Sequence, residues 1–180
     1  MGTLVSVDFF TVPTGMFTVW FVFVVLAPDR RRVVHVNVTD APTARWTAQQ
    51  LVEAFPEDPA PRYVLRDRDA VYGALFSSQV RSLGAQELKI APRSPWQNPY
   101  VERLIGTLRR ECLDHVVVLN DAHLRRVLRA YLAYYHEART PLALGKDAPE
   151  PRRVEPPDRG QIVATPMVGG LHHRYTRRAA

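Results

Sequence analysis

The sequence predicts an α/β fold in which helices flank a mixed five-stranded sheet. Three apolar stretches joined by turn residues come first, which is typical of antiparallel strands with short connections. A stretch with helical spacing then separates the third strand from the fourth, and crossovers of this kind join parallel neighbours. The first three strands are therefore predicted to be antiparallel, and the first and fourth can lie side by side in parallel.

The first three strands are separated by proline-containing turns. Leu4–Val7 is a short apolar strand, and Pro13–Gly15 forms a turn after it. Met16–Leu26 is rich in valine and phenylalanine, as a central strand should be. A second turn at Pro28–Arg30 leads into the third strand, Val33–Val38.

Two helices alternate with the last two strands. Thr39–Pro42 is typical of a helix start, and the helix is expected to end before Pro56. Tyr63–Leu65 is predicted to be a central strand, followed by a helix over residues 75–83 and a fifth strand at Glu87–Ile90. The apolar stripe expected on the first helix is Ala44, Ala48, Leu51, Val52 and Phe55.

Two more helices follow the fifth strand. Ser94–Pro99 contains helix-start residues, and the helix that carries Glu102 comes next. The expected buried stripe of this helix is Leu104, Ile105, Leu108 and Cys112. Trp96 is expected to pack under the helix, with a contact to DNA as the alternative. The last helix is predicted from Asp121 to Ala138.

The composition changes after the last helix. From Thr140 the chain is rich in proline, glycine and arginine, which argues against regular helix. We therefore expect a core over residues 1–140 and a tail over residues 141–180, with short strands possible at Gln161–Thr165 and Leu171–Tyr175.

Charge and cysteine content narrow the function classes. The 180-residue chain has a net charge of +6 and a pI of about 9.9, which favours a polyanionic partner, nucleic acid above a membrane surface. Cys112 is the single cysteine, so no internal disulfide is possible and a reducing compartment is expected. The most apolar run, Val19–Ala27, is far shorter than the roughly 20 residues of a membrane-spanning helix.

Three acidic residues stand where the predicted topology brings chain segments together. Asp8 follows the first strand, Asp67 follows the fourth, and Glu102 lies 35 positions after Asp67 in the first turn of a helix. Gathered carboxylates repel one another unless a cation compensates, and magnesium or manganese prefers oxygen ligands. Two such ions promote in-line attack at phosphorus. Taken singly, each acid is more often a turn or cap residue.

Three sequence blocks resemble the catalytic blocks of the retroviral-integrase-like core, and the closest resemblance is to bacterial insertion-sequence transposases of the Asp-Asp-Glu type. The blocks are Val7–Phe10, Arg66–Gly73 and Ser94–Arg103. Gly106–Leu113 and Tyr134–Leu144 resemble the two blocks that follow in these proteins. Because the blocks occur in order over most of the chain, the resemblance is more specific than a single motif.

The resemblance implies a ribonuclease-H-like fold and an enzyme that cleaves and joins DNA strands with divalent metal ions. It implies that Asp8, Asp67 and Glu102 are the catalytic acids and hold Mg²⁺ or Mn²⁺, as two ions. Many relatives have glycine two places after the second acid, where this chain has Asp69. Asp69 is therefore an alternative to Asp67, which we favour because it is nearer the strand end.

The resemblance also implies partners and a location. DNA is the expected partner, the chain is expected to form a homo-oligomer, and no membrane association is expected. The expected location is the bacterial cytoplasm, at the nucleoid when the protein is bound to DNA. Such transposases usually carry an N-terminal helix-turn-helix region, which is expected to be missing here because the chain starts almost at the first catalytic strand, as a fragment, a separate reading frame or a remnant would. Arg103, Arg109 and Arg110 are candidate phosphate contacts, although surface solubility explains them equally well.

Two alternative functions remain open from the sequence. One is a ribonuclease-H-like nuclease that cleaves DNA without joining it. The other is a non-catalytic DNA-binding remnant of a transposase, which would keep the basic surface without needing the acids. The presence of all three acids favours the catalytic interpretation.

Overall fold

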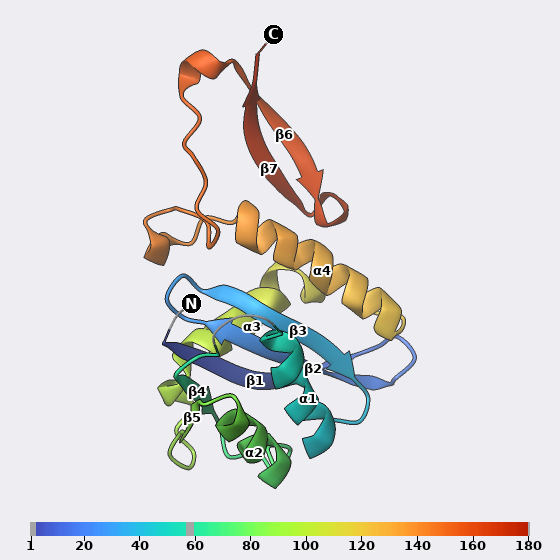
Figure 1. The fold of residues 1–180 in the computed structure, drawn as a ribbon. Helices are drawn as coiled ribbons and strands as arrows, with labels where there is room; N and C mark the ends of the chain where they lie inside the picture. The colour runs from blue at the N-terminus through green and yellow to red at the C-terminus, as the bar shows by residue number, and fades with distance from the viewer. Residues whose placement is uncertain (1–2, 57–59, 180) are drawn as a thin grey trace. The chain divides into compact units, whose positions relative to one another are not determined.

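Five strands form the central sheet of a computed structural model, which describes residues 3–56 and 60–179 apart from the side chain of Pro95. The strands lie in the order β3-β2-β1-β4-β5 (Figure 1). β1 (Leu4–Pro13), β2 (Val19–Ala27) and β3 (Arg32–Thr39) are antiparallel. β4 (Tyr63–Arg66) is parallel to β1, and β5 (Gln86–Lys89) is parallel to β4. The predicted fold class is confirmed, including the antiparallel order of the first three strands.

β1 is longer than the sequence suggested. It was expected to end at Val7, but it continues to Pro13 because β2 pairs with it along this whole length, from Ser6 opposite Leu26 to Pro13 opposite Val19. On its other side, β1 pairs with β4 only as far as Ser6, which lies opposite Leu65. Asp8 therefore lies inside β1, just beyond the point where the strand loses its parallel neighbour.

Helices cover both faces of this sheet. α1 (Ala44–Ala54) and α2 (Ala74–Ser82) pack on one face, where Leu51 and Phe76 join the core with Val5, Val7 and Phe23. α3 (Pro99–Glu111) contacts β1 and β2 and buries Val101, Leu104 and Leu108 (Figure 1). Because side chains alternate along a strand, Ser6 and Asp8 point away from the core that contains Val5 and Val7. Asp8 is therefore on the α3 side of the sheet.

The buried side of α1 differs from the predicted apolar stripe. Val52 is 40% exposed, whereas the polar residues Thr47 and Gln50 are buried. The Gln50 side-chain oxygen lies 2.6 Å from Nδ2 of Asn37 and 2.8 Å from Nε2 of His35. Asn37 and His35 lie on β3 and face α1. The side facing them carries the amide of Gln50 because buried polar groups need hydrogen-bond partners.

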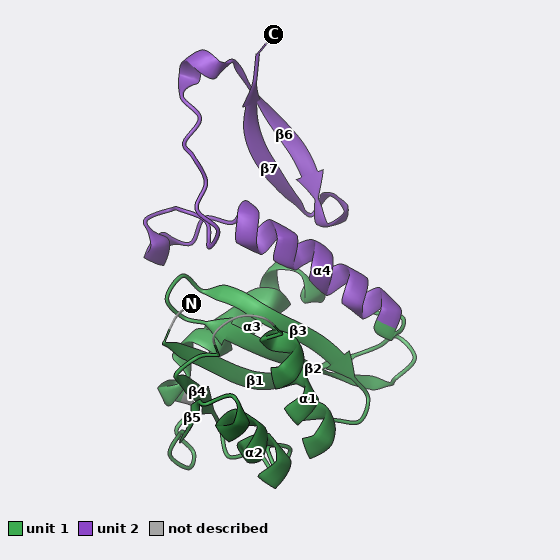
Figure 2. Cartoon of the chain, in the orientation of Figure 1, with its two compact units in different colours: residues 1–121 green, residues 122–180 purple. Residues whose placement is uncertain are grey.

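The remaining residues of the chain form a second compact unit. The chain divides into residues 1–121 and residues 122–180, and the two units are described separately (Figure 2). α4 (Asp121–Glu137) runs into the second unit, whose hairpin consists of β6 (Gln161–Met167) and antiparallel β7 (His172–Arg178). Short 3-10 turns lie at Pro95–Gln97, Leu113–His115, Leu142–Leu144, Pro157–Arg159 and Val168–Gly170.

The end of α4 is tied to the hairpin. The guanidinium of Arg174 donates to Glu137 at 2.7 Å, and the ring of His172 stacks on Tyr134 with centroids 4.2 Å apart. Packing therefore groups α4 with the residues that follow it, so the compact units divide earlier than the predicted core boundary at residue 140. Both strands considered for the tail are present, and both are longer than expected.

No helix within the described ranges has both the length and the apolar character that crossing a membrane requires.

The buried amide of α1 makes a testable contribution to stability. Replacing Gln50 with alanine leaves a cavity and removes the hydrogen-bond acceptor of Asn37, so we expect Gln50→Ala to lower the free energy of unfolding by about 2 kcal/mol. Urea denaturation measures this value. Gln49→Ala, on the exposed side of the same helix, is the matched control and is expected to change stability by less than about 0.5 kcal/mol. Equal losses for both variants would contradict this account of the α1–β3 contact.

Candidate active site

The parallel register of β1 and β4 places two acidic residues at the same level. Ser6 lies opposite Leu65 in the ladder, and Asp8 and Asp67 each lie two residues further along. Since residues two apart project from the same side of a strand, the two carboxylates leave neighbouring chain segments at the same edge of the sheet. Asp8 is half-buried within β1, and Asp67 is half-buried in the loop after β4.

α3 brings a third carboxylate to the same place. Asn98 and Pro99 begin the helix, and Glu102 lies in its first turn. A cavity of about 340 Å³ contains Asp8, Asp67 and Glu102 in its wall. The other residues that line it are Arg68, Asp69, Ile90, Ala91, Pro92, Arg93, Ser94 and Asn98. The structure therefore gathers the three acids predicted from the sequence around one cavity, while their catalytic role stays a prediction.

The pKa of Asp8 reflects the electrostatic environment of the cavity. Burial raises the pKa of Asp8 from 3.8 to about 7. The hydrogen bond from the backbone N–H of Phe9, 2.7 Å from Oδ1, opposes this rise. The neighbouring carboxylates of Asp67, Glu102 and Asp69 add to the rise, in that order. Asp8 thus holds a proton that a compensating cation would displace.

Hydrogen bonds hold the loop after β4 in a fixed shape. Oδ1 of Asp67 accepts from the backbone N–H of Asp69 at 3.0 Å, and Oδ1 of Asp69 accepts from the N–H of Val71 at 3.1 Å. Nε of Arg68 donates to the carbonyl of Ile90 at 2.9 Å. These bonds connect the loop to itself and to the end of β5, so the carboxylate of Asp67 is presented from a constrained backbone.

The buried Arg66 connects the same loop to β5. Its guanidinium contacts Oε1 of Glu87 at 2.6 Å and donates to the carbonyl of Asp67 at 2.7 Å. Ser77 donates to the same Glu87 oxygen at 3.1 Å. Breaking such a buried pair is unfavourable because it leaves an uncompensated charge. The network therefore holds the end of β4, and with it the backbone of Asp67, in one position. The sequence did not identify Arg66 as a residue that supports the site.

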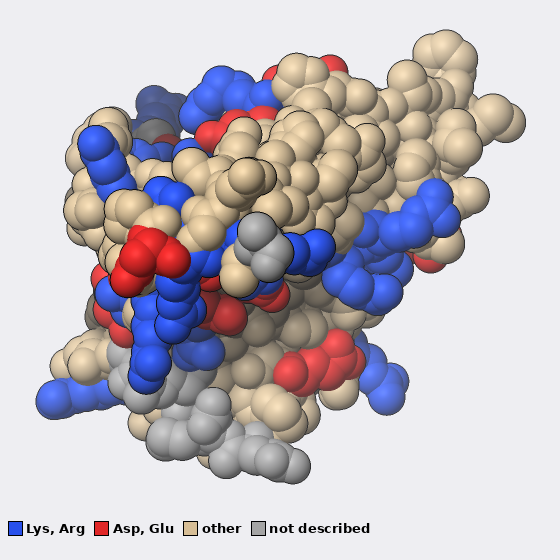
Figure 3. Space-filling view, turned by 90° about the horizontal axis from the view of Figure 1, so that it is seen from above, with Lys and Arg blue, Asp and Glu red and all other residues tan. Residues whose placement is uncertain are grey.

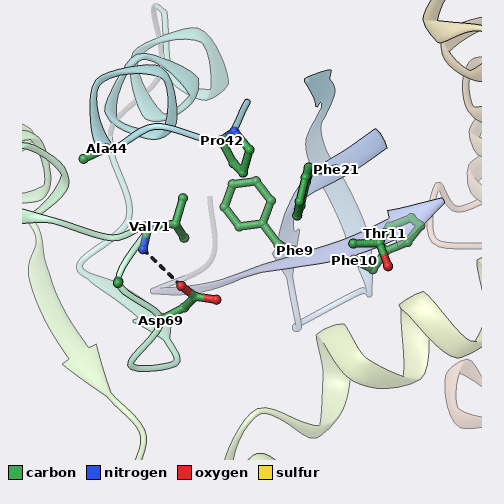
Figure 4. A pocket seen from close by; sticks show the side chains of 9 residues that line it. Phe9, Phe10, Thr11, Phe21, Pro42, Ala44, Asp69 and Val71 are labelled. Carbon is green, nitrogen blue, oxygen red and sulfur yellow. Dashed lines mark hydrogen bonds between the residues drawn. The ribbon is translucent and has the colours of Figure 1, made fainter. Parts of the chain in front are cut away.

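Asp67 and Asp69 occupy different positions. Asp67 and Asp69 both line the acid cavity, which also contains Asp8 and Glu102, and the exposed Asp69 lines a larger cavity of about 510 Å³ as well. Figure 4 shows that larger cavity, which Asp69 lines together with Phe9, Pro42 and Val71. Because seven of the nine residues that line the larger cavity are apolar and Asp69 is its one carboxylate, metal-ion chemistry fits the smaller cavity better. The greater effect of Asp67 on Asp8 agrees with the choice of Asp67 over Asp69.

Asn98 is a further cavity residue, which the sequence identified only as part of a helix start. Its side chain is buried, with 3% exposed, and its Nδ2 donates to the carbonyl of Val7 at 3.4 Å. Its Oδ1 has no hydrogen-bond partner among the described residues, and the side chain does not cap α3. Asn98 links the start of α3 to β1 next to Asp8, and therefore helps to bring Glu102 toward the cavity.

The side chains around the cavity fit divalent cations in kind. Carboxylate and amide oxygens are ligands that magnesium and manganese accept. Burial, and after it the neighbouring carboxylates, raise the pKa of Asp8, so a bound cation would favour its ionised form. In the described part of the chain, no three His, Cys, Asp or Glu side chains stand close enough together to hold an ion as they are.

The three predicted phosphate contacts on α3 have different surroundings. Arg103 and Arg110 are exposed. Arg109 is half-buried, donates to the carbonyl of Thr11 at 3.0 Å and lies over the ring of Phe10. Arg109 is thus already engaged with β1. Figure 3 shows basic side chains in several separate groups on the face that it presents.

Trp96 is 69% exposed, so the prediction that it packs under the helix is wrong. It belongs to a 3-10 turn, Pro95–Gln97, that precedes α3.

The raised pKa of Asp8 gives a pH dependence with a defined sign. The folded protein holds a proton on Asp8 up to about pH 7 that the unfolded chain releases near its usual pKa of 3.8. Without metal, the free energy of unfolding contributed by Asp8 therefore falls as the pH rises from about 4 to about 7. Magnesium must displace this proton, so its apparent affinity should rise by up to about tenfold per pH unit below about pH 7 and level off above.

Thermal unfolding and calorimetric Mg²⁺ titrations from about pH 5 to about pH 8 measure both effects. Asp8→Asn is expected to remove this pH dependence of stability in the metal-free protein. The electrostatic account is contradicted if wild type and Asp8→Asn show the same pH dependence of unfolding.

Part of the sequence matches a known protein family, and the fold is found in solved structures. Residues 83–149 match a protein-family model described as the integrase core domain. This segment contains β5, α3 and α4. No curated protein matches the chain in sequence.

Solved structures share the fold at low sequence identity. A chain of the simian T-cell lymphotropic virus intasome in complex with PP2A regulatory subunit B56γ is 16% identical with a TM-score of 0.66, and the match covers 97% of this protein and 66% of that chain, just under two thirds. The HTLV-2 integrase catalytic core domain in complex with magnesium is 14% identical with a TM-score of 0.62. This match covers 81% of this protein and 93% of that chain. The catalytic domain of Mos1 mariner transposase is 15% identical with a TM-score of 0.61. This match covers 73% of this protein and 70% of that chain.

Proposed function

We propose that this chain, a member of the integrase and transposase superfamily, cleaves DNA strands and joins them to new partners with the help of divalent metal ions. One observation carries the proposal. Asp8 from β1, Asp67 from the loop after β4 and Glu102 from α3 line one cavity, on a fold shared with integrase and transposase catalytic domains. Polynucleotidyl transfer is the general role that the fold and the family match support.

The three acids are proposed to hold Mg²⁺ or Mn²⁺, as two ions. Bound divalent cations supply positive charge for in-line attack at a phosphodiester. The residues of the chain provide the binding and the orientation. Asp8 binds once its proton is lost, the constrained loop after β4 presents Asp67, and Asn98 holds the first turn of α3 against β1. Because Glu102 is exposed, it lies where a DNA strand can approach the cavity.

DNA and further copies of the chain are the proposed partners. The exposed Arg103 lies next to Glu102, and Arg110 is exposed on the same helix, so both can contact phosphates near the cavity. Arg109 is a weaker candidate because it already binds the carbonyl of Thr11. The HTLV-2 core in complex with magnesium is a trimeric form, and the simian virus structure is an intasome, which supports a homo-oligomer here. An insertion-sequence origin and a bacterial cytoplasmic location stay predictions.

Nicking of labelled DNA tests the proposal. The wild-type chain is expected to nick DNA in Mg²⁺ or Mn²⁺ and to stop when the metal is chelated. Asp67→Asn and Glu102→Gln each remove a negative oxygen ligand, so each is expected to lower the nicking rate at least about a hundredfold. Asp114→Asn, at an exposed acid outside the cavity, is the matched control and should retain wild-type activity.

The same assay separates Asp67 from Asp69. Asp69→Asn is expected to retain most of the nicking activity that Asp67→Asn loses. The reverse result would assign the second ligand to Asp69. If the wild-type chain bound DNA without nicking it in either metal, the catalytic proposal would fail and the remnant interpretation would stand.

A donor strand with a free 3′-hydroxyl tests joining. Strand transfer to a second duplex supports an integrase or transposase reaction. Nicking without transfer would identify a nuclease of the same fold.

A further inference from the structure

The positive charge of the protein is unevenly distributed along the chain. Residues 122–180 contain eleven Lys and Arg against five Asp and Glu, which equals the whole net charge of +6. Residues 1–121 contain thirteen of each and are neutral in sum. The unit with the three acids therefore brings no net attraction for a polyanion, and the C-terminal unit supplies it.

A groove in the C-terminal unit concentrates this charge. It has a volume of about 700 Å³ and lies between the segment 145–159 and the β6–β7 hairpin. Lys146, Arg152, Arg153 and Arg159 line it and are exposed. Within residues 3–56 and 60–179, none of these four side chains has a hydrogen bond or an ion pair. Their charges are thus available for a ligand.

The other charged residues of the groove are already in use. Arg174 pairs with Glu137, and Arg177 donates to the carbonyl of Gly160 at 3.0 Å. The carboxylate of Glu155 accepts the backbone N–H of Arg177, and Asp147 accepts the N–H of Ala148 at 2.8 Å. The hairpin and its bonds therefore build the groove, and the four cations that have no partner among the described residues lie along its wall.

The groove also contains exposed apolar surface. Tyr175 is 59% exposed and Ile162 is 63% exposed, and both belong to the hairpin. Cations beside an exposed aromatic ring are typical of surfaces on which bases stack while phosphates are neutralised. A duplex keeps its base faces covered by stacking, so an unpaired strand uses this ring and a duplex does not.

We propose that this groove binds an unpaired DNA strand, with phosphates at Lys146, Arg152, Arg153 and Arg159 and a base against Tyr175. The choice of DNA rests on the proposed function of the acid cavity. The groove itself follows from the C-terminal unit alone. Binding of this kind contacts the sugar-phosphate backbone and stacks on any base, so it does not select a sequence.

Binding is best measured with the full chain carrying Asp67→Asn, in the presence of a chelator, so that neither metal nor cleavage contributes. Fluorescence anisotropy with a labelled single strand and with the matching duplex, over a series of salt concentrations, gives affinity and salt slope. The single strand is expected to bind more tightly than the duplex. Arg152→Ser with Arg153→Ser is expected to lower the magnitude of the single-strand salt slope by about 1.4, or about 0.7 for each cation.

A charge-matched control distinguishes the groove from general attraction. Arg126 and Arg129 are exposed on α4 in the same unit and lie outside the groove. The pair Arg126→Ser and Arg129→Ser removes the same charge and should leave the salt slope near that of the parent. Thermal unfolding of each variant shows whether it is folded. Equal slopes for the two double variants would overturn the proposal.

Tyr175 tests the stacking contact. Tyr175→Ala is expected to weaken single-strand binding about tenfold, whereas Tyr175→Phe keeps the ring and should bind like the parent. Equal affinity of the parent for single strand and duplex would overturn the assignment to an unpaired strand. Nicking by the unsubstituted chain is scored separately, so a failure of catalysis and a failure of the groove give different results.

Discussion

The parallel pairing of β1 with β4 is the constraint on which the acid cavity depends. The pairing sets Asp8 level with Asp67, and it stops two residues before either acid, which leaves both carboxylates at an open edge. Shifting β1 by one residue against β4 would turn Asp8 to the opposite face of the sheet. The apolar side chains of Val5, Val7 and Val64 oppose such a shift because all three are fully buried in one core.

Burial and the neighbouring carboxylates make ionisation of Asp8 unfavourable in the metal-free fold. Without a cation, the fold keeps Asp8 protonated up to about pH 7. The buried Arg66–Glu87 pair and the contact of Asn98 with Val7 hold the surrounding backbone in place. The site is therefore built by the sheet, the loop and α3 before any ligand binds. Its residual charge is what makes a cation a suitable ligand.

Much of this arrangement is readable in the sequence because turns, helix starts and apolar periods are local features. They predicted five strands and their order of appearance, and they placed the acids at the right segments. The length of β1 was not predictable, since it depends on pairing with β2 across a turn. The burial of Gln50 on α1 was not predicted, because the side chains that it contacts lie on β3. The prediction that Trp96 packs under the helix was wrong, since distant chain segments decide burial. The helix start predicted at Asn98 is present, but its burial in the cavity was not foreseen.

The central claim is that one cavity between β1, β4 and α3 binds a catalytic divalent cation. Anomalous X-ray diffraction from crystals of the chain grown in Mn²⁺ tests it most directly, because manganese is located independently of any activity. The account predicts an anomalous peak bounded by the carboxylates of Asp8, Asp67 and Glu102, and no such peak for the Asp67→Asn variant. A wild-type peak elsewhere, or none under conditions that support nicking, would contradict the account.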